Sequence, residues 1–435
     1  GGVGDARGFV RTIGAREPDA AALGRIRLEM ANVNLAFDAP RAAHLAGRSR
    51  CDTRKAVLIG GGAIGAHVLE YLAREGRFQW TIIDHDTLLP HNLSRHTLTA
   101  AHVGVLKAVS LASRLRQILG GEDTAKAIAA NVLKPGEFTE AVESALAEAS
   151  IVIDASASVA AGRHIADITP ASARAASVFF NPSGTAAVLL AEPAGRSVTL
   201  RDLEAQYYRA VLQRAALESH LAQGAALVPY AGACRALTSR IPQTSVAGLS
   251  ALAAAGLSSA LAQDGGLIAI WTLGEDGTVL RTSVAAEEVT RHEALGWRLV
   301  VGKEVQCAIE EKRREKLPRE TGGVLLGVID NLARSIYVVD ALPAPVDSAE
   351  GAAAFERGIE RLTETAQAAI DRTLGQIRYV GEWHSHPPRA STRPSGTDLC
   401  QLVWLSGLVR NDGVPAVMLI AGDDGLRAML CQRRM

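Results

Sequence analysis

Two histidines and an aspartate near the end of the chain have the residue types and spacing of a metal site. Residues 382–387 read Glu-Trp-His-Ser-His-Pro, and Asp398 follows twelve residues after His386. On an extended segment His384 and His386 point to the same side, and the aspartate can supply a third corner of a tetrahedron. The fourth corner then stays open for water. The spacing therefore predicts a catalytic zinc ion and a hydrolytic reaction.

This pattern resembles the JAB/JAMM metallopeptidases, which cleave peptide or isopeptide bonds after the C-terminus of ubiquitin and ubiquitin-like proteins. The resemblance implies that Glu320, in Arg-Glu-Thr-Gly-Gly, takes a proton from water on the metal and passes it to the leaving amine. It also implies that Ser395 hydrogen-bonds the developing oxyanion. A second interpretation stays open, because Ser395 and Asp398 also have the spacing of a helix-capping box on an ordinary surface loop.

A glycine-rich turn near the other end of the chain predicts a nucleotide site. The apolar run 56–59 leads into Gly-Gly-Gly-Ala-Ile-Gly at 60–65 and then into a helical pattern. Glycines at Gly60, Gly62 and Gly65 let the backbone approach a polyphosphate, and the N-terminus of the next helix supplies unpaired amides. Taken alone, the turn with Asp84 farther on also fits a nicotinamide or flavin dinucleotide domain.

The residues that follow the turn resemble those of ThiF and ubiquitin-activating enzymes, which use ATP and Mg²⁺ to adenylate the C-terminal glycine of a ubiquitin-fold protein. They are Asp84, then Asn92 and Arg95 in Asn-Leu-Ser-Arg, then Lys107, then Asp154 at the end of an apolar run. The resemblance places Asp84 on the ribose and Asp154 on Mg²⁺. It places Asn92, Arg95 and Lys107 on the phosphates, where the two cations would be catalytic because attack on the α-phosphate builds negative charge.

Two features depart from that family pattern, and one cysteine has an open role. His96 stands where Gln is usual, and no Cys-x-x-Cys pairs supply a structural zinc site. Cys234 precedes an apolar helix, about where ubiquitin-activating enzymes carry the cysteine that forms a thioester. Beside Arg235 and Arg240 its thiol would have a lowered pKa and could accept the activated carboxyl. A small buried thiol with no chemical role is an equal alternative.

Composition favours a cytoplasmic enzyme and excludes some partners. The 435 residues include 46 basic and 46 acidic ones, so the net charge of zero favours neither nucleic acid nor an anionic membrane. No run of eighteen apolar residues predicts a membrane span. Five scattered cysteines form no disulfide framework, which fits a reducing compartment. The chain begins Gly-Gly without Met, so we expect it to be part of a longer product.

The order of motifs predicts an α/β protein of two main domains. Residues 1–48 would be an N-terminal helical segment, 49–290 a Rossmann-like adenylating domain with a mostly parallel sheet, and 291–435 an α+β JAB/JAMM domain of the cytidine-deaminase-like kind. The broken apolar segment 175–192 predicts two strands, residues 267–282 predict a hairpin, and 352–373 predicts a long helix.

Both domains by resemblance act on the same kind of tail, so the fusion predicts a bifunctional enzyme of a bacterial ubiquitin-like pathway, similar to components of antiviral conjugation systems. The implied partners are a β-grasp protein ending in glycine, a conjugating enzyme and a second copy of the chain, paired through the adenylating domain. The implied cofactors are ATP, Mg²⁺ and Zn²⁺. Two alternatives stay open: sulfur-carrier processing and thiocarboxylate formation, and a non-catalytic scaffold in which one motif has decayed.

Overall fold

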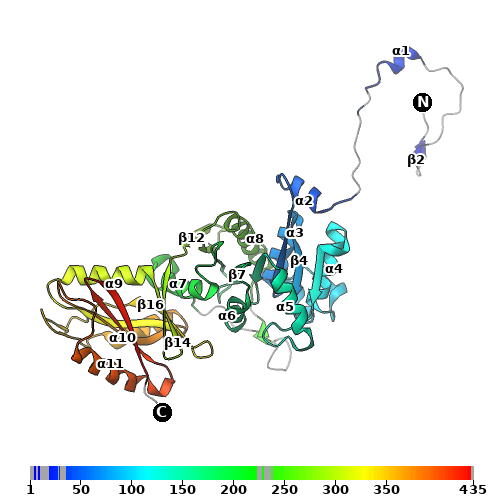
Figure 1. Ribbon diagram of the computed structural model, residues 1–435. Helices are drawn as coiled ribbons and strands as arrows, with labels where there is room; N and C mark the ends of the chain where they lie inside the picture. The colour runs from blue at the N-terminus through cyan, green and yellow to red at the C-terminus, as the bar shows by residue number, and fades with distance from the viewer. Residues whose placement is uncertain are drawn as a thin grey trace. The chain divides into compact units, whose positions relative to one another are not determined.

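The structure is a computed structural model, and it describes residues 4–5, 8–9, 19–27, 29, 36–222, 228–229, 237–238 and 240–432. The chain divides into two compact units, Gly1–Phe37 and Asp38–Met435. The described elements of the first unit are β1 (Gly4–Asp5), β2 (Gly8–Phe9) and the short helix α1 (Ala20–Leu23). All candidate site residues that the structure describes belong to the second unit. Figure 1 shows the helices and strands of this unit from α2 onward.

The first part of the second unit is built on a sheet of eight strands in the order β12-β11-β8-β7-β6-β3-β4-β5. The five strands from β5 to β7 run parallel, and β8, β11 and β12 are added antiparallel. The strands are β3 (Asp52–Ile59), β4 (Arg77–Ile83), β5 (Ala125–Ile128), β6 (Ile151–Asp154), β7 (Arg174–Phe180), β8 (Ala186–Ala191), β11 (Leu267–Leu273) and β12 (Val279–Ala285). This is the mostly parallel sheet that the sequence predicts.

Helices cover both faces of this sheet, which explains why its central strands read as continuous apolar runs. Along β11, Ile268 and Ile270 pack in the cluster that contains α7, whereas Trp271 lies against Gly256 of α8 on the opposite face. The helices are α2 (Ala39–Leu45), α3 (Ala63–Arg74), α4 (Lys107–Leu119), α5 (Thr139–Glu148), α6 (Val159–Ile168), α7 (Leu200–Gln213) and α8 (Gln243–Ala260).

Short elements connect these layers. They are the 3₁₀ helices η1 (Pro90–Ser94), η2 (Ala100–His102), η3 (Glu122–Thr124), η4 (Gly136–Phe138) and η5 (Ala215–Leu217), and the strand pair β9 (Val228–Pro229) and β10 (Leu237–Thr238).

The second part is built on a sheet of seven strands in the order β13-β14-β16-β15-β19-β20-β21. Pairs β14–β16 and β19–β20 are parallel and the others antiparallel. Its elements are β13 (Val289–Ala294), β14 (Trp297–Gly302), α9 (Lys303–Lys316), β15 (Gly322–Asp330), β16 (Ser335–Ala341), β17 (Ala349–Glu350), β18 (Phe355–Glu356), α10 (Leu362–Arg372), β19 (Arg378–Ser385), α11 (Gly396–Leu408), η6 (Arg410–Asp412), β20 (Ala416–Gly422) and β21 (Gly425–Cys431). Apolar residues of α9 and α11 share one core with β19 and β20.

The long helix predicted over 352–373 is wrong in its first half. Residues 355–356 form strand β18, and the helix begins only at Leu362. The carboxylate of Asp347 accepts hydrogen bonds from the backbone N–H groups of Ile359 (2.9 Å) and Glu360 (3.0 Å). Arg361 has a positive φ of 54°. A side chain distant in sequence therefore holds these amides in a turn that local periodicity does not reveal.

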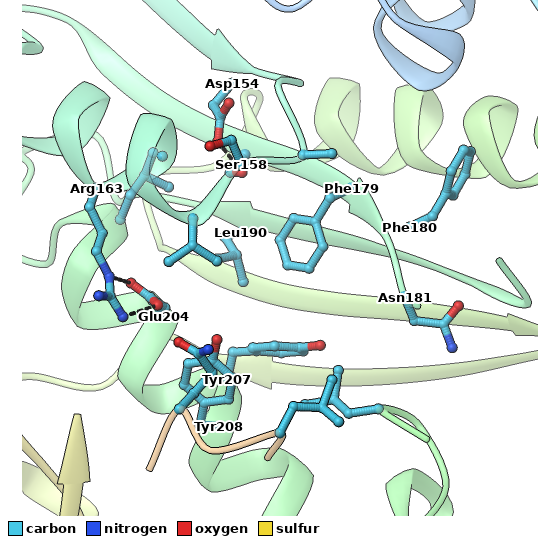
Figure 2. Close-up of a pocket in the computed structure, with 18 of the residues that line it drawn as sticks. Asp154, Ser158, Arg163, Phe179, Phe180, Asn181, Leu190, Glu204, Tyr207 and Tyr208 are labelled. Carbon is cyan, nitrogen blue, oxygen red and sulfur yellow. Dashed lines mark hydrogen bonds and ion pairs between the residues drawn. The ribbon is translucent and has the colours of Figure 1, made fainter. Parts of the chain in front are cut away.

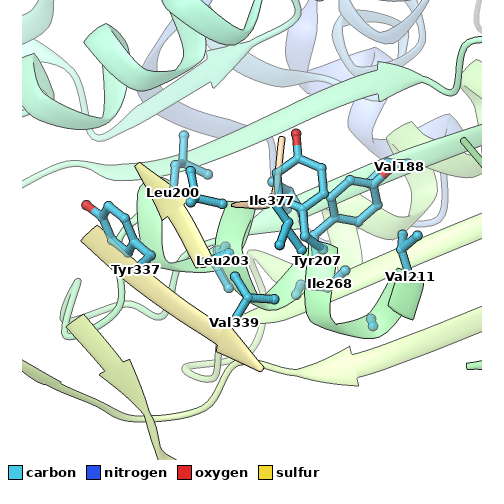
Figure 3. Packing of buried hydrophobic residues seen from close by; sticks show 14 of the residues in the cluster. Val188, Leu200, Leu203, Tyr207, Val211, Ile268, Tyr337, Val339 and Ile377 are labelled. Carbon is cyan, nitrogen blue, oxygen red and sulfur yellow. The ribbon is translucent and has the colours of Figure 1, made fainter. Parts of the chain in front are cut away.

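One hydrophobic core joins the two sheets through α7 (Figure 3). Leu200, Leu203 and Tyr207 of this helix lie in the same cluster as Val188 of the first sheet and Val339 of the second. Almost all of α7 is buried, because sheets cover it on two sides.

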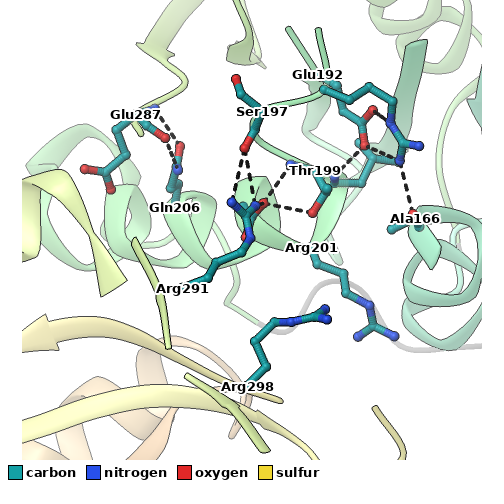
Figure 4. A network of polar contacts seen from close by, with 12 residues as sticks. Ala166, Glu192, Ser197, Thr199, Arg201, Gln206, Glu287, Arg291 and Arg298 are labelled. Atoms are coloured by element: carbon teal, nitrogen blue, oxygen red, sulfur yellow. Dashed lines mark hydrogen bonds and ion pairs between the residues drawn. The ribbon is translucent and has the colours of Figure 1, made fainter. Parts of the chain in front are cut away.

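Arginines along and beside α7 add polar contacts across the same junction, and Figure 4 shows Arg291 of β13 donating to the carbonyl of Ser197. Arg201 binds Asp167 of α6 (2.5 Å) and Asp330 of β15 (2.6 Å). Arg209 donates to the carbonyl of Val339 at 2.9 Å. These buried charges are paired, so each arginine contributes to a fixed arrangement of the two sheets within the unit.

Candidate nucleotide and metal sites

The glycine turn after β3 is closely packed and needs glycine at two of its positions. Gly60 has a φ of +96°, and a Cβ at Gly65 would lie 2.0 Å from the carbonyl oxygen of Gly60. Gly62 is the N-cap of α3, and a Cβ there would meet nothing within 4 Å. The open side of the turn at Gly62 therefore faces space in which a ligand can approach the backbone.

Asp84, at the end of β4, lies beside this turn. Its carboxylate accepts hydrogen bonds from the N–H groups of Gly61 (2.6 Å) and Asp86 (2.7 Å). Burial raises the pKa of Asp84, although these hydrogen bonds and Lys107 act in the opposite direction. The carboxylate thus fixes the glycine turn, and its contact with a ribose stays a prediction.

His96 holds the other side of the turn. Its Nε2 lies 2.7 Å from the carbonyl oxygen of Gly61, and its Nδ1 accepts a hydrogen bond from the N–H of Leu98 at 3.1 Å. Burial lowers the pKa of His96 to about 4, so the ring is neutral and Nε2 carries the proton. A neutral imidazole in this tautomer offers one donor and one acceptor, as a glutamine amide does, which accounts for His at this position.

The residues expected on phosphates come together at the open side of the turn. Asn92, Arg95 and Lys107 line a cavity of about 210 Å³ that also includes Gly62 and Phe180. Lys107 Nζ lies 2.9 Å from Asp86, and burial lowers the pKa of Arg95. Two partly buried cations beside the N-terminus of a helix make a site for an anion.

Asp154 ends β6 and is almost fully buried. Its carboxylate accepts hydrogen bonds from the hydroxyls of Ser156 (2.6 Å) and Ser177 (2.8 Å). Burial raises its pKa. Among the described residues, Asp154 belongs to no group of three or more His, Cys, Asp or Glu side chains that could hold a metal ion. A single carboxylate with hydroxyl neighbours still fits Mg²⁺, because this ion usually takes one or two carboxylates and completes its shell with substrate phosphates and water.

His384, His386 and Asp398 come together as the spacing predicts. Ligand atoms of the three side chains all lie within 4.8 Å of one another. Nε2 of His384 is 3.2 Å from Asp398 Oδ1, and Nε2 of His386 is 3.4 Å from Oδ2. Nε2 of His384 is buried and has no hydrogen-bond partner, since its contact with the carboxylate lacks hydrogen-bond geometry. Two imidazoles and a carboxylate with an orphaned nitrogen fit a zinc ion with an open position.

Neighbouring groups orient these side chains. Nδ1 of His386 is 2.6 Å from the carbonyl oxygen of Ser391, so Nδ1 carries the proton and Nε2 is free to bind a metal. Burial alone would raise the pKa of Asp398, but His384 and the hydrogen bonds with Ser395 hold it well below its usual range. Ser395 and Asp398 also form the capping box of α11, so the capping spacing is confirmed, but the side chains of His384, His386 and Asp398 are buried and do not belong to an ordinary surface loop.

Strand pairing brings Glu320 to the same place. Gly322 of β15 pairs with His384 of β19, and the N–H of Ser385 donates to the carbonyl of Thr321 at 2.7 Å. Glu320, two residues before Gly322, therefore reaches the histidines. Burial raises the pKa of Glu320, and both histidines oppose that shift. A carboxyl with a raised pKa is suited to accept and return a proton near neutral pH.

Two side chains near this cluster were not predicted from the sequence. Arg313 of α9 donates to the carbonyl oxygens of His386 (3.0 Å) and Pro387 (3.3 Å) and so anchors the loop that carries the second histidine. Glu382 lies on the same face of β19 as His384, but its carboxylate forms an ion pair with Arg357 at 3.0 Å. The sequence did contain a signal for Arg313. It lies four residues after Ile309, as Ile309 lies four residues after Val305, so all three side chains share the buried face of α9.

Cys234 lies outside the described residues, and so do its neighbours from 230 to 236.

Comparison with known protein families matches two separate ranges of the chain. Residues 38–181 match the ThiF family, and residues 302–432 match the prokaryotic homologs of the JAB domain. The chain is therefore a fusion of a ThiF domain and a prokaryotic JAB-type domain.

Two similar proteins come from bacteria. A CD-NTase/cGAS isopeptidase of Enterobacter hormaechei subsp. hoffmannii (strain UCI 50) is 34% identical over 105 residues, which are 24% of this chain and 56% of the relative. The ATP-dependent ubiquitin transferase-like protein Cap2 of Vibrio cholerae serotype O1 is 28% identical over 214 residues, 44% of this chain and 34% of the relative. The chain thus spans about a third to just over half of these relatives.

Among solved structures, E. coli MccB with ATP aligns with 56% of this chain and 66% of its own, at 14% identity and a TM-score of 0.37. MccB with AMPCPP and MccA aligns with 54% of this chain and 64% of its own, at 16% identity and a TM-score of 0.36. Within the part of the chain that the structure describes, no helix is both long and apolar enough to cross a membrane.

Proposed function

We propose that the chain is a bifunctional enzyme of a ubiquitin-like conjugation pathway. Its ThiF domain adenylates the C-terminal glycine of a ubiquitin-like protein with ATP and Mg²⁺, and its JAB domain hydrolyses the peptide or isopeptide bond after such a C-terminus with Zn²⁺. The observation that carries the proposal is the presence, in one compact unit, of an anion site beside a glycine turn and a cluster of two histidines and an aspartate.

In the adenylating half, the open backbone at Gly62 and the side chains of Asn92, Arg95 and Lys107 receive the phosphates. The two cations meet the negative charge that grows as a carboxylate attacks the α-phosphate and pyrophosphate leaves. Asp154 would hold Mg²⁺, which supplies further positive charge to the same phosphates.

In the hydrolytic half, His384, His386 and Asp398 would hold Zn²⁺, which lowers the pKa of a bound water toward ~7. Glu320 takes a proton from the water and delivers it to the leaving amine. The hydroxyl of Ser395, whose oxygen accepts from the Asp398 N–H at 3.2 Å, keeps its own proton to donate to the oxyanion.

Adenylation is tested by ATP–pyrophosphate exchange with the chain, Mg²⁺ and glycine-ending ubiquitin-like proteins. Lys107→Met keeps the buried stem and removes the charge, and we expect it to reduce exchange by about a hundredfold or more. Lys134→Met alters an exposed lysine and serves as the control. No exchange with any glycine-ending partner, or equal exchange by the Lys107 variant, would refute this half.

Zinc binding is tested by metal analysis of the purified protein. We expect one zinc per chain, loss of that zinc in His384→Ala, and full retention in the control His44→Ala, which changes an exposed histidine. Cleavage of a fusion after the partner's C-terminal glycine should disappear in Glu320→Gln although zinc is retained. Full zinc content in His384→Ala contradicts the ligand assignment.

The homodimer and the conjugating enzyme also belong to this proposal, as does a thioester on Cys234. A thioester would appear as a band on a nonreducing gel that Cys234→Ala abolishes. Transfer to a conjugating enzyme that continues in Cys234→Ala would remove the cysteine from the mechanism.

A further inference from the structure

A second cavity, of about 300 Å³, lies beside Asp154 on the adenylating domain (Figure 2). Its walls are mostly apolar and aromatic, with Phe179, Leu190, Tyr207 and Tyr208 prominent among them. Its charged lining residues are two acids and two bases, so their formal charges cancel, and one acid and one base are joined directly: Arg163 binds Glu204 at 2.7 Å, and Asp154 and Arg201 are the other two. A cavity of this size and lining suits an uncharged, largely apolar group.

This cavity adjoins the phosphate cavity. Phe180 lines both, and Asp154, proposed above to hold Mg²⁺, lines the apolar one. A group bound here is therefore next to the site where a carboxylate would meet ATP. Because the attacking carboxylate is the end of a polypeptide, the group that adjoins it is the segment of that polypeptide before the terminal glycine.

The JAB domain supplies part of the wall. Thr373, Leu374 and Gln376, from the turn between α10 and β19, line the cavity together with α6 and α7. The turn is held by the N–H of Gly375, which donates to the carbonyl of Ile370 at 2.8 Å. Arg372 donates to the carbonyl of Arg214, just after α7, at 3.1 Å. The JAB turn is thus fixed to the adenylating domain where it meets the cavity.

Leu374 has the features of a residue that contacts a ligand. It is an apolar side chain left 43% exposed, and its backbone is in the left-handed region with a φ of 53°. Ala157, which also lines the cavity, has a φ of 54°. Such conformations are unfavourable for residues other than glycine and are found preferentially at ligand-binding sites.

We propose that this cavity binds an apolar side chain of the substrate polypeptide just before its terminal glycine, and that Leu374 of the JAB domain determines which side chain is accepted. The inference rests on the proposed adenylation and adds that the JAB domain takes part in it. An apolar wall from a second domain, on a cavity with no net charge, selects against charged residues at that position of the tail.

The first test measures KM in pyrophosphate exchange with short synthetic peptides that end in one glycine, in which each position before that glycine carries Ala, Leu or Trp in turn. Leu374→Trp narrows the cavity and should raise KM for the best apolar peptide about tenfold, with KM for ATP unchanged. Leu374→Gly adopts the positive φ without strain and should shift preference toward the larger side chain. Leu332→Trp, on a fully exposed leucine of the same domain, is the control.

The second test does not depend on turnover. The same peptide, with benzoylphenylalanine at the position that discriminates best, is irradiated with the full chain, ATP and Mg²⁺, and the crosslinked residues are mapped. We expect crosslinks at residues 373–376 and at Tyr207 or Tyr208. Unchanged KM values in both Leu374 variants, or crosslinks confined elsewhere, overturn the inference. If the wild-type chain crosslinks there but shows no exchange, the adenylation proposal fails while the peptide site stands.

Discussion

His96 offers a quantitative test of how the glycine turn is held. The ring bridges Gly61 and Leu98 as a neutral donor and acceptor, and burial is the main cause of its lowered pKa of about 4. Glutamine has the same donor and acceptor but no proton to gain. His96→Gln should therefore keep the conformation of the glycine turn and remove the pH dependence that His96 gives to the free energy of unfolding.

The size of the effect follows from linkage. In the unfolded chain the pKa of His96 returns to about 6.5, so the unfolded state binds a proton first as the pH falls. The contribution of the neutral His96 ring to the free energy of unfolding is complete above pH 6.5, and it is lost as the pH falls from 6.5 to about 4. At 1.36 kcal/mol for each pKa unit, the full loss is about 3 kcal/mol, of which roughly 2 kcal/mol appears by pH 4.5.

The free energy of unfolding would be measured by urea denaturation at several pH values between 7 and about 4.5. We expect wild type and His96→Gln to agree within about 1 kcal/mol at pH 7 and the variant to be more stable at acid pH by roughly 2 kcal/mol. His220, whose pKa burial also lowers to about 4, provides a comparison, because the effect of His220→Gln should add to that of His96→Gln. Parallel pH profiles for wild type and His96→Gln would refute the reasoning.

Three other tests concern the framework around the sites. Gly65→Ala should destabilise the fold by about 1–3 kcal/mol, because its Cβ meets a carbonyl, whereas Gly62→Ala should leave stability within about 0.5 kcal/mol in urea and yet weaken ATP binding measured by calorimetry. Arg313→Ala should lower zinc affinity about tenfold in a chelator competition, and the exposed Arg314→Ala should not; equal affinities would contradict its anchoring role. Arg201→Ala should cost about 3 kcal/mol in urea denaturation, since it removes the ion-pair partner of buried Asp330 at 2.6 Å and leaves only the more distant Arg163 at 3.9 Å, and a loss below about 1 kcal/mol would disagree.

The parallel sheet and the grouping of the candidate site residues could be predicted because their signals are local. The apolar run at 56–59 and the glycines after it specify a strand and a turn within ten residues. The spacing of His384 and His386 fixes their common direction on β19 whatever the rest of the chain does. Features that a short segment specifies by itself can be predicted without knowledge of the tertiary structure.

Features that depend on distant residues could not be predicted in this way. The start of α10 is set by Asp347, which binds amides about a dozen residues on, and periodicity alone extended the helix through them. The donor and acceptor roles of His96 became visible only when the ring lay against Gly61. The packing of both domains against α7 has no signal in any short segment, because the helix contacts residues of two different sheets.

The burial of α7 between the two sheets limits how the protein can be dissected. Cutting the chain near residue 290 would strip this helix of Tyr337 and Val339 and expose their apolar faces, and the cavity beside Asp154 would lose its wall at Leu374. The separated domains would then tend to aggregate, and a loss of activity in either one would not show which residues carry that activity. Point substitutions in the intact polypeptide are therefore the sound way to test each proposed activity separately.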